Sequence, residues 1–178
     1  MRSNNRPDSQ KRGPSFIEEA RRRQIVETAI GTIADLGSAQ TTLAVIAKGA
    51  GISKGVISYH FDGKDELLEE VLSCLVREPA AFIKARVDSE ATAQGRLTAY
   101  VEAFFEFLAR HRAHYVALVD LWGGAGASEG RRRFNVEAYE PSRHYLVHIL
   151  EDGLASGEFR AVPSRTMAAV LQGAIDGV

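Results

Sequence analysis

The chain has 178 residues, of which 45 % are hydrophobic and 25 % charged, and a formal net charge of −1. This composition is typical of a globular protein with a buried core. No segment approaches the ~18 consecutive apolar residues of a membrane-spanning helix, and the first residues lack the apolar stretch of a secretory signal, so we expect a cytoplasmic protein. Cys74 is the only cysteine, which excludes an intramolecular disulfide and a metal cluster held by several thiolates, and we expect it to be buried.

The charges are divided unevenly along the chain. Up to Phe61, nine basic residues stand against five acidic ones, a balance of +4, whereas the remainder carries 13 basic and 18 acidic residues, a balance of −5. A basic first third on an acidic remainder indicates that only the first third meets a polyanion such as nucleic acid.

The first third predicts a flexible arm followed by short helices. Residues 1–14 are polar and basic, without apolar periodicity. Ser15 and Glu18 then have the spacing of a capping box, and apolar residues recur every three or four positions as far as Gly37. Two short helices are expected at 43–50 and 54–60; Thr41 and Thr42 offer N-caps for the first, and Ser53 caps the second.

The rest of the chain predicts longer helices. A fourth helix begins at Lys64, and Pro79 starts or kinks the segment after it. Further helices are expected at 97–108, 115–122 and 131–155 with a bend near Pro141, and a last one runs from Pro163 or Ser164 to Val178. No segment alternates apolar and polar residues as a strand does, so the fold class is all-α. We predict an arm at 1–14, a helix-turn-helix domain at 15–62 and a second, longer helical domain at 63–178.

The stretch from Thr41 to Lys64 has the pattern of a helix-turn-helix. Two short amphipathic helices are joined by a tight turn at Gly51, where a left-handed backbone lets the second helix cross the first steeply. Helical periodicity turns Ile57 and Phe61 inward and leaves an outer face that suits close approach to DNA.

These residues resemble the DNA-binding head of the TetR-type bacterial transcriptional regulators. A helix ending in Gly37 is followed by TTLAVIAKGAGISKG, then YHF, then GKDEL. The chain departs from the family pattern at Ser58, where a tyrosine is usual, and has its tyrosine next door at Tyr59, about 100° further around the helix. The positions that match are Thr42, Ile46, Ala47, Ala50, Gly51, Ser53, Gly55, His60, Phe61, Lys64 and Leu67.

Roles at DNA follow from residue chemistry. Lys54 is the candidate for reading guanine in the major groove, and Val56 for contacting a thymine methyl group. Thr42 with the free amides of its helix is the candidate for one phosphate. Basic residues of the arm are candidates for an adjacent minor groove. The full set of predicted DNA-binding residues is Thr42, Lys54, Gly55, Val56, Ser58, Tyr59, His60 and Lys64, and the arm adds Arg2, Arg6, Lys11 and Arg12.

Two aromatic stripes at helical spacing in the second domain predict either plain core or a ligand cavity. One stripe consists of Tyr100, Phe104, Phe107, Leu108 and His111, and the other of Tyr115, Leu118, Val119 and Trp122. The resemblance implies an effector pocket here for an unknown small molecule, of roughly 300 to 1,000 Å³. The predicted ligand-binding residues are Tyr100, Phe104, Phe107, His111, Tyr115, Trp122 and Tyr139.

An apolar stripe at the end of the chain predicts a two-fold helical interface, because the family resemblance implies a homodimer. The stripe stops at Val178 in mid-pattern, from which we expect the chain to be cut short or unusually brief. The predicted interface residues are Leu146, Leu150, Leu154, Met167, Leu171, Ala174, Ile175 and Val178.

The sequence thus predicts a homodimeric, ligand-responsive repressor that binds a palindromic DNA operator, with no catalytic residue, metal or cofactor and no membrane contact. Two alternatives remain open. One is an all-α metal-dependent enzyme that uses His144 and His148 with Glu140, one helical turn apart from each other. The other is a ligand-binding protein whose DNA-binding head is vestigial.

Overall fold

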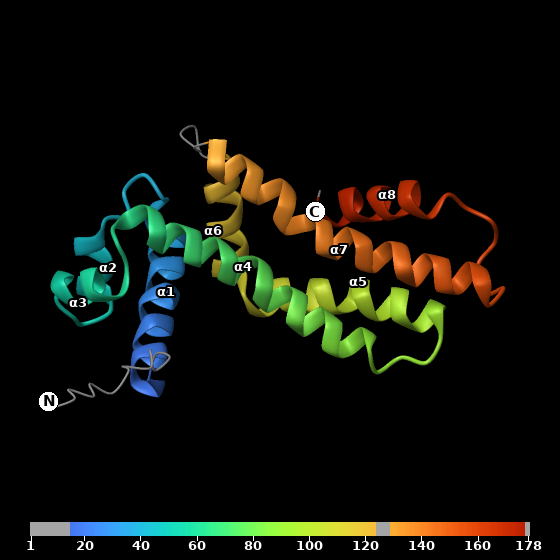
Figure 1. Cartoon of the computed structure of the whole chain (residues 1–178), viewed down its shortest axis with the longest axis horizontal. Coiled ribbons are helices and arrows are strands. Elements are labelled where there is room, and N and C mark those ends of the chain that lie inside the picture. Colours follow the sequence, from blue (N-terminus) through green and yellow to red (C-terminus); the bar gives the residue numbers. More distant parts are fainter. Residues whose placement is uncertain (1–14, 124–128, 177–178) are drawn as a thin grey trace, which may run out of the picture.

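A computed structural model describes residues 15–123 and 129–176, and the side chains of 123–139 and 176 are not described. The described residues form eight helices and no strand (Figure 1), which confirms the all-α prediction. None of these helices combines the length and apolar character needed to cross a lipid bilayer. The helices are α1 (Phe16–Leu36), α2 (Leu43–Gly49), α3 (Lys54–His60), α4 (Lys64–Val87), α5 (Ala93–Arg110), α6 (Arg112–Gly123), α7 (Glu129–Ala155) and α8 (Ser164–Asp176).

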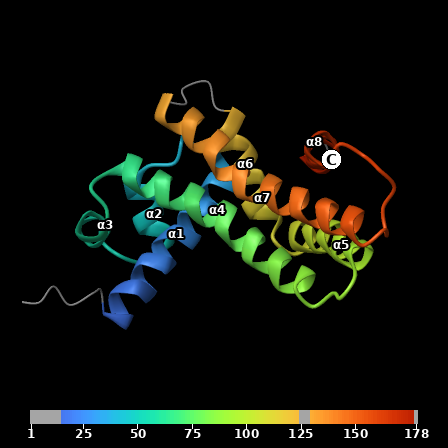
Figure 2. The same ribbon diagram turned by 45° about the vertical axis from the view of Figure 1, so that its right-hand side comes forward.

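The helices are arranged as a head and a body. Helices α1 to α3 lie together at one end of the molecule, and α4 runs from them into a bundle with α5, α7 and α8 (Figures 1 and 2). Helix α6 packs against both α1 and α4, so it stands between the head and the bundle. The N-caps at Ser15 and Ser53 are confirmed, including the complete capping box between Ser15 and Glu18, and of the two threonines predicted to cap α2 it is Thr42 that does so.

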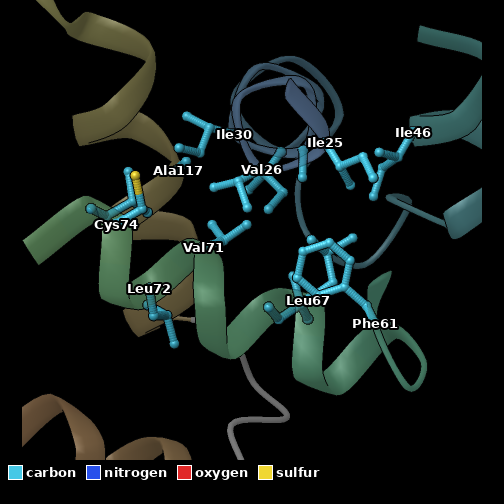
Figure 3. Packing of buried hydrophobic residues seen from close by; sticks show 14 of the residues in the cluster. Ile25, Val26, Ile30, Ile46, Phe61, Leu67, Val71, Leu72, Cys74 and Ala117 are labelled. Atoms are coloured by element: carbon cyan, nitrogen blue, oxygen red, sulfur yellow. The ribbon is translucent and has the colours of Figure 1, made fainter. Parts of the chain in front are cut away.

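The first hydrophobic core holds the head together and extends into α4 and α6 (Figure 3). Its centre is the buried face of α1, against which Ile46 of α2, Ile57 of α3 and Leu67 of α4 pack with no exposed surface. Ala117 and Leu121 of α6 belong to the same core and are at most 1 % exposed. Helix α6 is therefore held against the head by buried apolar contact.

Cys74 lies in this first core, 5 % exposed, as the sequence predicts. Burial, with a hydrogen bond to Glu78, raises the pKa of its thiol to about 12. The thiol is therefore protonated at neutral pH and is a poor nucleophile.

A second core joins α4, α5, α7 and α8 in the body. Ala103 of α5, Leu146 of α7 and Ala168 of α8 are fully buried in it. Here Gly153 of α7 matters, because a Cβ atom at that position would lie 2.1 Å from the ring of Phe159. The glycine allows the chain after α7 to fold back closely onto the helix.

Pro79 does not begin a helix, which corrects one of the two expectations for it. It lies inside α4, which runs without interruption from Lys64 to Val87. A proline inside a helix removes one backbone hydrogen bond, at a cost of about 3 kcal/mol. Packing of α4 against α1, α5, α6 and α7 outweighs that cost.

Candidate DNA interface and body cavity

The helix-turn-helix is built by two capped helices and one glycine turn. The side chains of Thr42 and Ser53 accept hydrogen bonds from the backbone amides of Val45 and Val56, at 3.3 and 3.4 Å. Gly51 has a φ of 66° in the turn between them, a conformation that favours glycine. The turn sets the direction in which α3 leaves α2.

The two faces of α3 differ sharply. Ile57 is fully buried, and Phe61, directly after the helix, is 2 % exposed. On the opposite side Lys54, Gly55 and Ser58 are exposed, while Val56 and His60 are half-buried. The inward and outward positions predicted from the periodicity are therefore those of the structure, and the outer face presents a cation, a glycine and a hydroxyl group.

Tyr59 is 72 % exposed, and its hydroxyl group donates a hydrogen bond to Oε1 of Glu18 at 3.0 Å. This contact places a carboxylate beside the tyrosine that the sequence assigns to a DNA phosphate. The hydrogen bond that Tyr59 donates to Glu18 raises the pKa of Tyr59, and hydrogen bonds from Ser15 and Tyr59 lower the pKa of Glu18. Glu18 is thus ionised at neutral pH, close to the expected path of the phosphate backbone.

Lys64 is half-buried and its ammonium group donates to the carbonyl oxygen of Ser38 at 2.8 Å. The amide of Ser38 in turn donates to Oδ2 of Asp120, in α6, at 2.8 Å. Asp120 thereby links α6 to the segment that leads into Thr42. Sequence reasoning missed this link, because no local pattern connects positions 38 and 120.

Arg22 is a further residue that sequence reasoning missed. Its guanidinium group lies 4.2 Å from the ring centre of Phe61 and donates to the carbonyl oxygen of His60 at 2.6 Å. It also pairs with Glu70 of α4 at 3.2 Å. Through these contacts, Arg22 holds the end of α3 against α1 and α4. The basic arm residues Arg2, Arg6, Lys11 and Arg12 lie outside the described residues.

A cavity of about 110 Å³ lies in the body, among α4, α5, α6, α7 and α8. Five predicted ligand-binding residues line it, namely Tyr100, Phe104, Phe107, Tyr115 and Trp122. Its volume is below the predicted lower limit, because side chains of five helices converge on it and fill much of the space between the two aromatic stripes.

The polar residues that line the cavity differ from those predicted to bind the ligand. His111 does not line it, and its ring instead stacks on Phe107 at 4.3 Å between centres. His114, Ser142 and Gln172 line it, and the hydroxyl group of Tyr100 donates to Gln172 at 3.3 Å. The side chain of Tyr139 lies outside the described residues.

The histidines proposed for a metal enzyme are spread along the surface of α7. The side chains of His144 and His148 are 69 % and 73 % exposed. Nδ1 of His144 lies 2.9 Å from the backbone oxygen of Glu140, and His148 lies 3.9 Å from Glu151. Within the described part of the chain, a group of three metal-ligand side chains occurs elsewhere, at Glu27, Glu78 and His114.

Comparisons with known proteins match both parts of the chain. Residues 25–71 match the family model described as bacterial regulatory proteins, tetR family, and residues 93–178 match that of the BetI-type transcriptional repressor, C-terminal. The HTH-type transcriptional repressor KstR2 of Mycobacterium tuberculosis is 32 % identical over 141 residues, which cover 79 % of this chain and 70 % of that protein. The chain belongs to the tetR family.

Two further relatives cover the chain to different extents. The HTH-type transcriptional regulator BetI of Cronobacter sakazakii is 34 % identical over 111 residues, which are 61 % of this chain and only 55 % of that protein. A solved transcriptional regulator from Saccharomonospora viridis, in complex with choline, has a TM-score of 0.80 and 27 % identity, and covers 89 % of this chain and 83 % of that one. The matches thus include both the head and the body of this tetR-family chain.

The interface residues predicted on the last two helices of this tetR-family chain differ in how far the single chain already buries them. Leu146, Leu150 and Ile175 are 0 %, 4 % and 5 % exposed, so they already belong to the core of the single chain. Periodicity identifies an apolar face but cannot tell an intramolecular contact from an intermolecular one. Of the other predicted interface residues, Leu154, Met167 and Leu171 are half-buried, Ala174 is exposed and Val178 lies outside the described residues. Val170, also on α8, is a large apolar side chain that is 59 % exposed.

Proposed function

We propose that this chain is a cytoplasmic transcriptional repressor that binds a palindromic DNA operator as a homodimer and responds to a small-molecule effector bound in its body. Membership of the tetR family supports DNA binding. A dimer presents two heads to the two halves of a palindrome, whereas one head contacts only one half.

The observation that carries this proposal is the geometry of α3. Its inner side is anchored by Ile57 and Phe61 in the first core, and its outer side carries no acidic residue of the helix itself and exposes Lys54 next to Gly55. Glycine lets the helix approach the edges of the bases, and a lysine at the start of such a helix reaches guanine O6 and N7. Thr42, Ser58, Tyr59, His60 and Lys64 are assigned to neighbouring phosphates, and Val56 to a thymine methyl group.

Selection of bound duplexes from a random pool tests this assignment. We expect a palindromic site, and a loss of log affinity with log salt concentration of about 0.9 per phosphate contact. Lys54→Ala should relax the preference at one base pair in each half-site and weaken binding to the selected site by about 1–3 kcal/mol. Lys48→Ala, an exposed lysine of α2, is the matched control and should leave the selected sequence unchanged. An unchanged selected sequence with Lys54→Ala would refute its role in base reading.

The body cavity is assigned to a compact organic cation of the choline class. Five aromatic side chains line a volume of about 110 Å³, which suits a small ligand rather than a long-chain one. Aromatic faces attract quaternary ammonium groups by cation–π interaction. The choline bound to the Saccharomonospora viridis relative supports the same class.

Fluorescence of Trp122, the single tryptophan, measures this binding directly. Choline should change the emission with saturation, and its uncharged carbon analogue 3,3-dimethylbutan-1-ol should bind more weakly. Phe104→Leu keeps the cavity apolar but removes one ring face, and should weaken choline binding by about 2- to 30-fold. Equal binding of the two ligands, or no saturable change, would contradict the cation assignment while leaving the DNA-binding proposal intact.

Helix α6 provides the connection between cavity and head. Leu118, Val119 and Trp122 of α6 line the cavity, while Ala117 and Leu121 on the same helix are buried in the core of the head. Asp120 adds the hydrogen bond to the segment before α2. A ligand that displaces α6 therefore acts on the position of the head, and such couplings are typically worth ~1–3 kcal/mol.

A further inference from the structure

Three metal-ligand side chains from three helices converge at the junction between head and body. Glu27 belongs to α1, Glu78 to α4 and His114 to α6, and one possible ligand atom of each lies within 4.8 Å of the other two. Nε2 of His114 lies 3.1 Å from Oε2 of Glu78. The DNA interface and the choline-class ligand make no use of Glu27 or Glu78.

The surroundings hold these side chains in place while leaving a path from solvent. Each ligand position neighbours the first core: Val26 precedes Glu27, Leu75 lies one turn before Glu78, and Ala117 lies one turn after His114. The side chain of His114 is 12 % exposed and that of Glu78 is 37 % exposed. Glu27 is exposed, and a surface hollow of about 230 Å³ between α1 and α4 is lined by Glu78. A hydrated ion can therefore reach a site whose backbone supports are rigid.

The donor set selects the class of ion. One imidazole nitrogen and two carboxylates suit divalent first-row transition metals such as Zn²⁺ and Mn²⁺, whereas Mg²⁺ and Ca²⁺ prefer oxygen ligands alone. Three protein ligands leave room for water at the remaining positions. The basic side chain nearest in sequence to Glu78 is Arg77, which pairs with Glu70 at 3.9 Å. Arg22 and Arg23 also line the hollow, and Arg22 is engaged by Glu70.

We propose that Glu27, Glu78 and His114 bind a divalent transition-metal ion that ties α1 of the DNA-binding head to α4 and α6 of the body. A bound ion replaces the direct contact between His114 and Glu78 by two bonds to the metal and adds Glu27 as a third ligand. Because His114 also lines the body cavity, the ion lies between the effector and the head.

Binding of Zn²⁺ to tag-free, chelator-treated protein, followed by calorimetry and by thermal unfolding, tests the site without DNA or effector. We expect one ion per chain and a rise in Tm of about 5–10 °C when free Zn²⁺ is a hundred times its Kd. Failure of this experiment leaves the proposed repressor function untouched, because neither readout involves DNA.

Three variants and one control locate the ion. Glu27→Gln, Glu78→Gln and His114→Gln should each weaken Zn²⁺ binding at least tenfold. Glu27 is exposed, so its variant retains the fold and keeps the test decisive if the other two unfold. The control is His144→Gln with His148→Gln, on the exposed side of α7, and it should bind Zn²⁺ as the unchanged chain does. The proposal is overturned if no saturable binding occurs, if Glu27→Gln binds normally, or if the α7 control abolishes binding.

Discussion

At the scale of single residues, Glu18 places a carboxylate directly against Tyr59, one of the proposed phosphate contacts. Its carboxylate accepts the hydrogen bond from Tyr59 and completes the capping box of α1. Glu18→Gln keeps the shape and an acceptor oxygen but removes the negative charge. We expect affinity for all DNA sequences to rise about 2- to 5-fold at low salt, since a charge near a phosphate costs a fraction of a kcal/mol in water. Fluorescence anisotropy with operator and random duplexes measures this.

Glu19→Gln is the matched control for that change. Glu19 is exposed and lies in the same turn of α1, but it makes no contact with Tyr59 among the interactions of the described residues. It should leave DNA affinity nearly unchanged. Equal effects of the two variants would show that only total charge matters and that Tyr59 and Glu18 do not face the DNA backbone.

Glu158 is the residue whose ionisation should tie stability to pH. The backbone amides of Gln94 and Ala93, at the start of α5, donate to its carboxylate at 3.0 and 3.2 Å and lower its pKa from the ordinary value of 4.5. A carboxylate with a lowered pKa in the folded state stabilises the protein above its unfolded pKa, and this contribution is lost as the pH falls through the folded pKa. The stabilisation is therefore complete near neutral pH and disappears at acidic pH below 4.5.

Glu158→Gln should lower the free energy of unfolding at pH 7. Its difference in unfolding free energy from the unchanged chain should shrink as the pH falls below 4.5. Urea unfolding at a series of pH values measures it. Glu151→Gln, which alters an exposed carboxylate of α7, should give a smaller difference at pH 7. A difference for Glu158→Gln that does not depend on pH would contradict the role of its charge.

At the scale of helices, the end of α7 depends on the absence of a side chain at Gly153. The ring of Phe159 occupies the space that a Cβ would take, and the amide of Phe159 donates to the carbonyl oxygen of Gly153 at 2.9 Å. Gly153→Ala should destabilise the fold by about 1–3 kcal/mol, because the ring must leave its position in the second core. Gly31→Ala, in α1, meets nothing within 4 Å and should instead stabilise the fold by about 0.5–1 kcal/mol. Thermal and urea unfolding compare the two variants; stabilisation by Gly153→Ala would show that Phe159 does not pack there.

At the scale of the whole molecule, the proposed dimer must use side chains that the single chain leaves exposed. Val170 is 59 % exposed and Ala174 lies one turn further along α8. Val170→Glu with Ala174→Glu should yield folded monomers that bind the operator poorly, because two charges cannot be buried against a second copy without a large penalty. Ile175→Glu is unsuitable, since Ile175 is buried within the chain and its replacement damages the fold itself.

Analytical ultracentrifugation measures the association state, and circular dichroism checks that the variant is folded. Ala85→Glu, at an exposed position of α4, serves as the control and should leave association unchanged. A double variant of α8 that still sediments as a dimer would place the interface on another surface.

The amino-acid sequence by itself determined the helical class, the caps of the first three helices and the two faces of α3. These features are local, because a cap acts over three residues and an amphipathic face repeats every three or four. The same locality made the helix-turn-helix motif recognisable, and it located the aromatic residues that line the body cavity.

Only the tertiary structure decided which side chains from distant positions meet. Asp120 beside Ser38, Arg22 on Phe61, and Glu27 with Glu78 and His114 are separated by tens of residues, and no periodicity connects them. The apolar stripe of α8 shows the same limit, since its pattern indicates burial but not the partner: Ile175 is buried in its own chain while Val170 is exposed. The size of the cavity could not be predicted from the sequence either. It depends on how closely the side chains of five helices pack, which the spacing of aromatic residues does not encode.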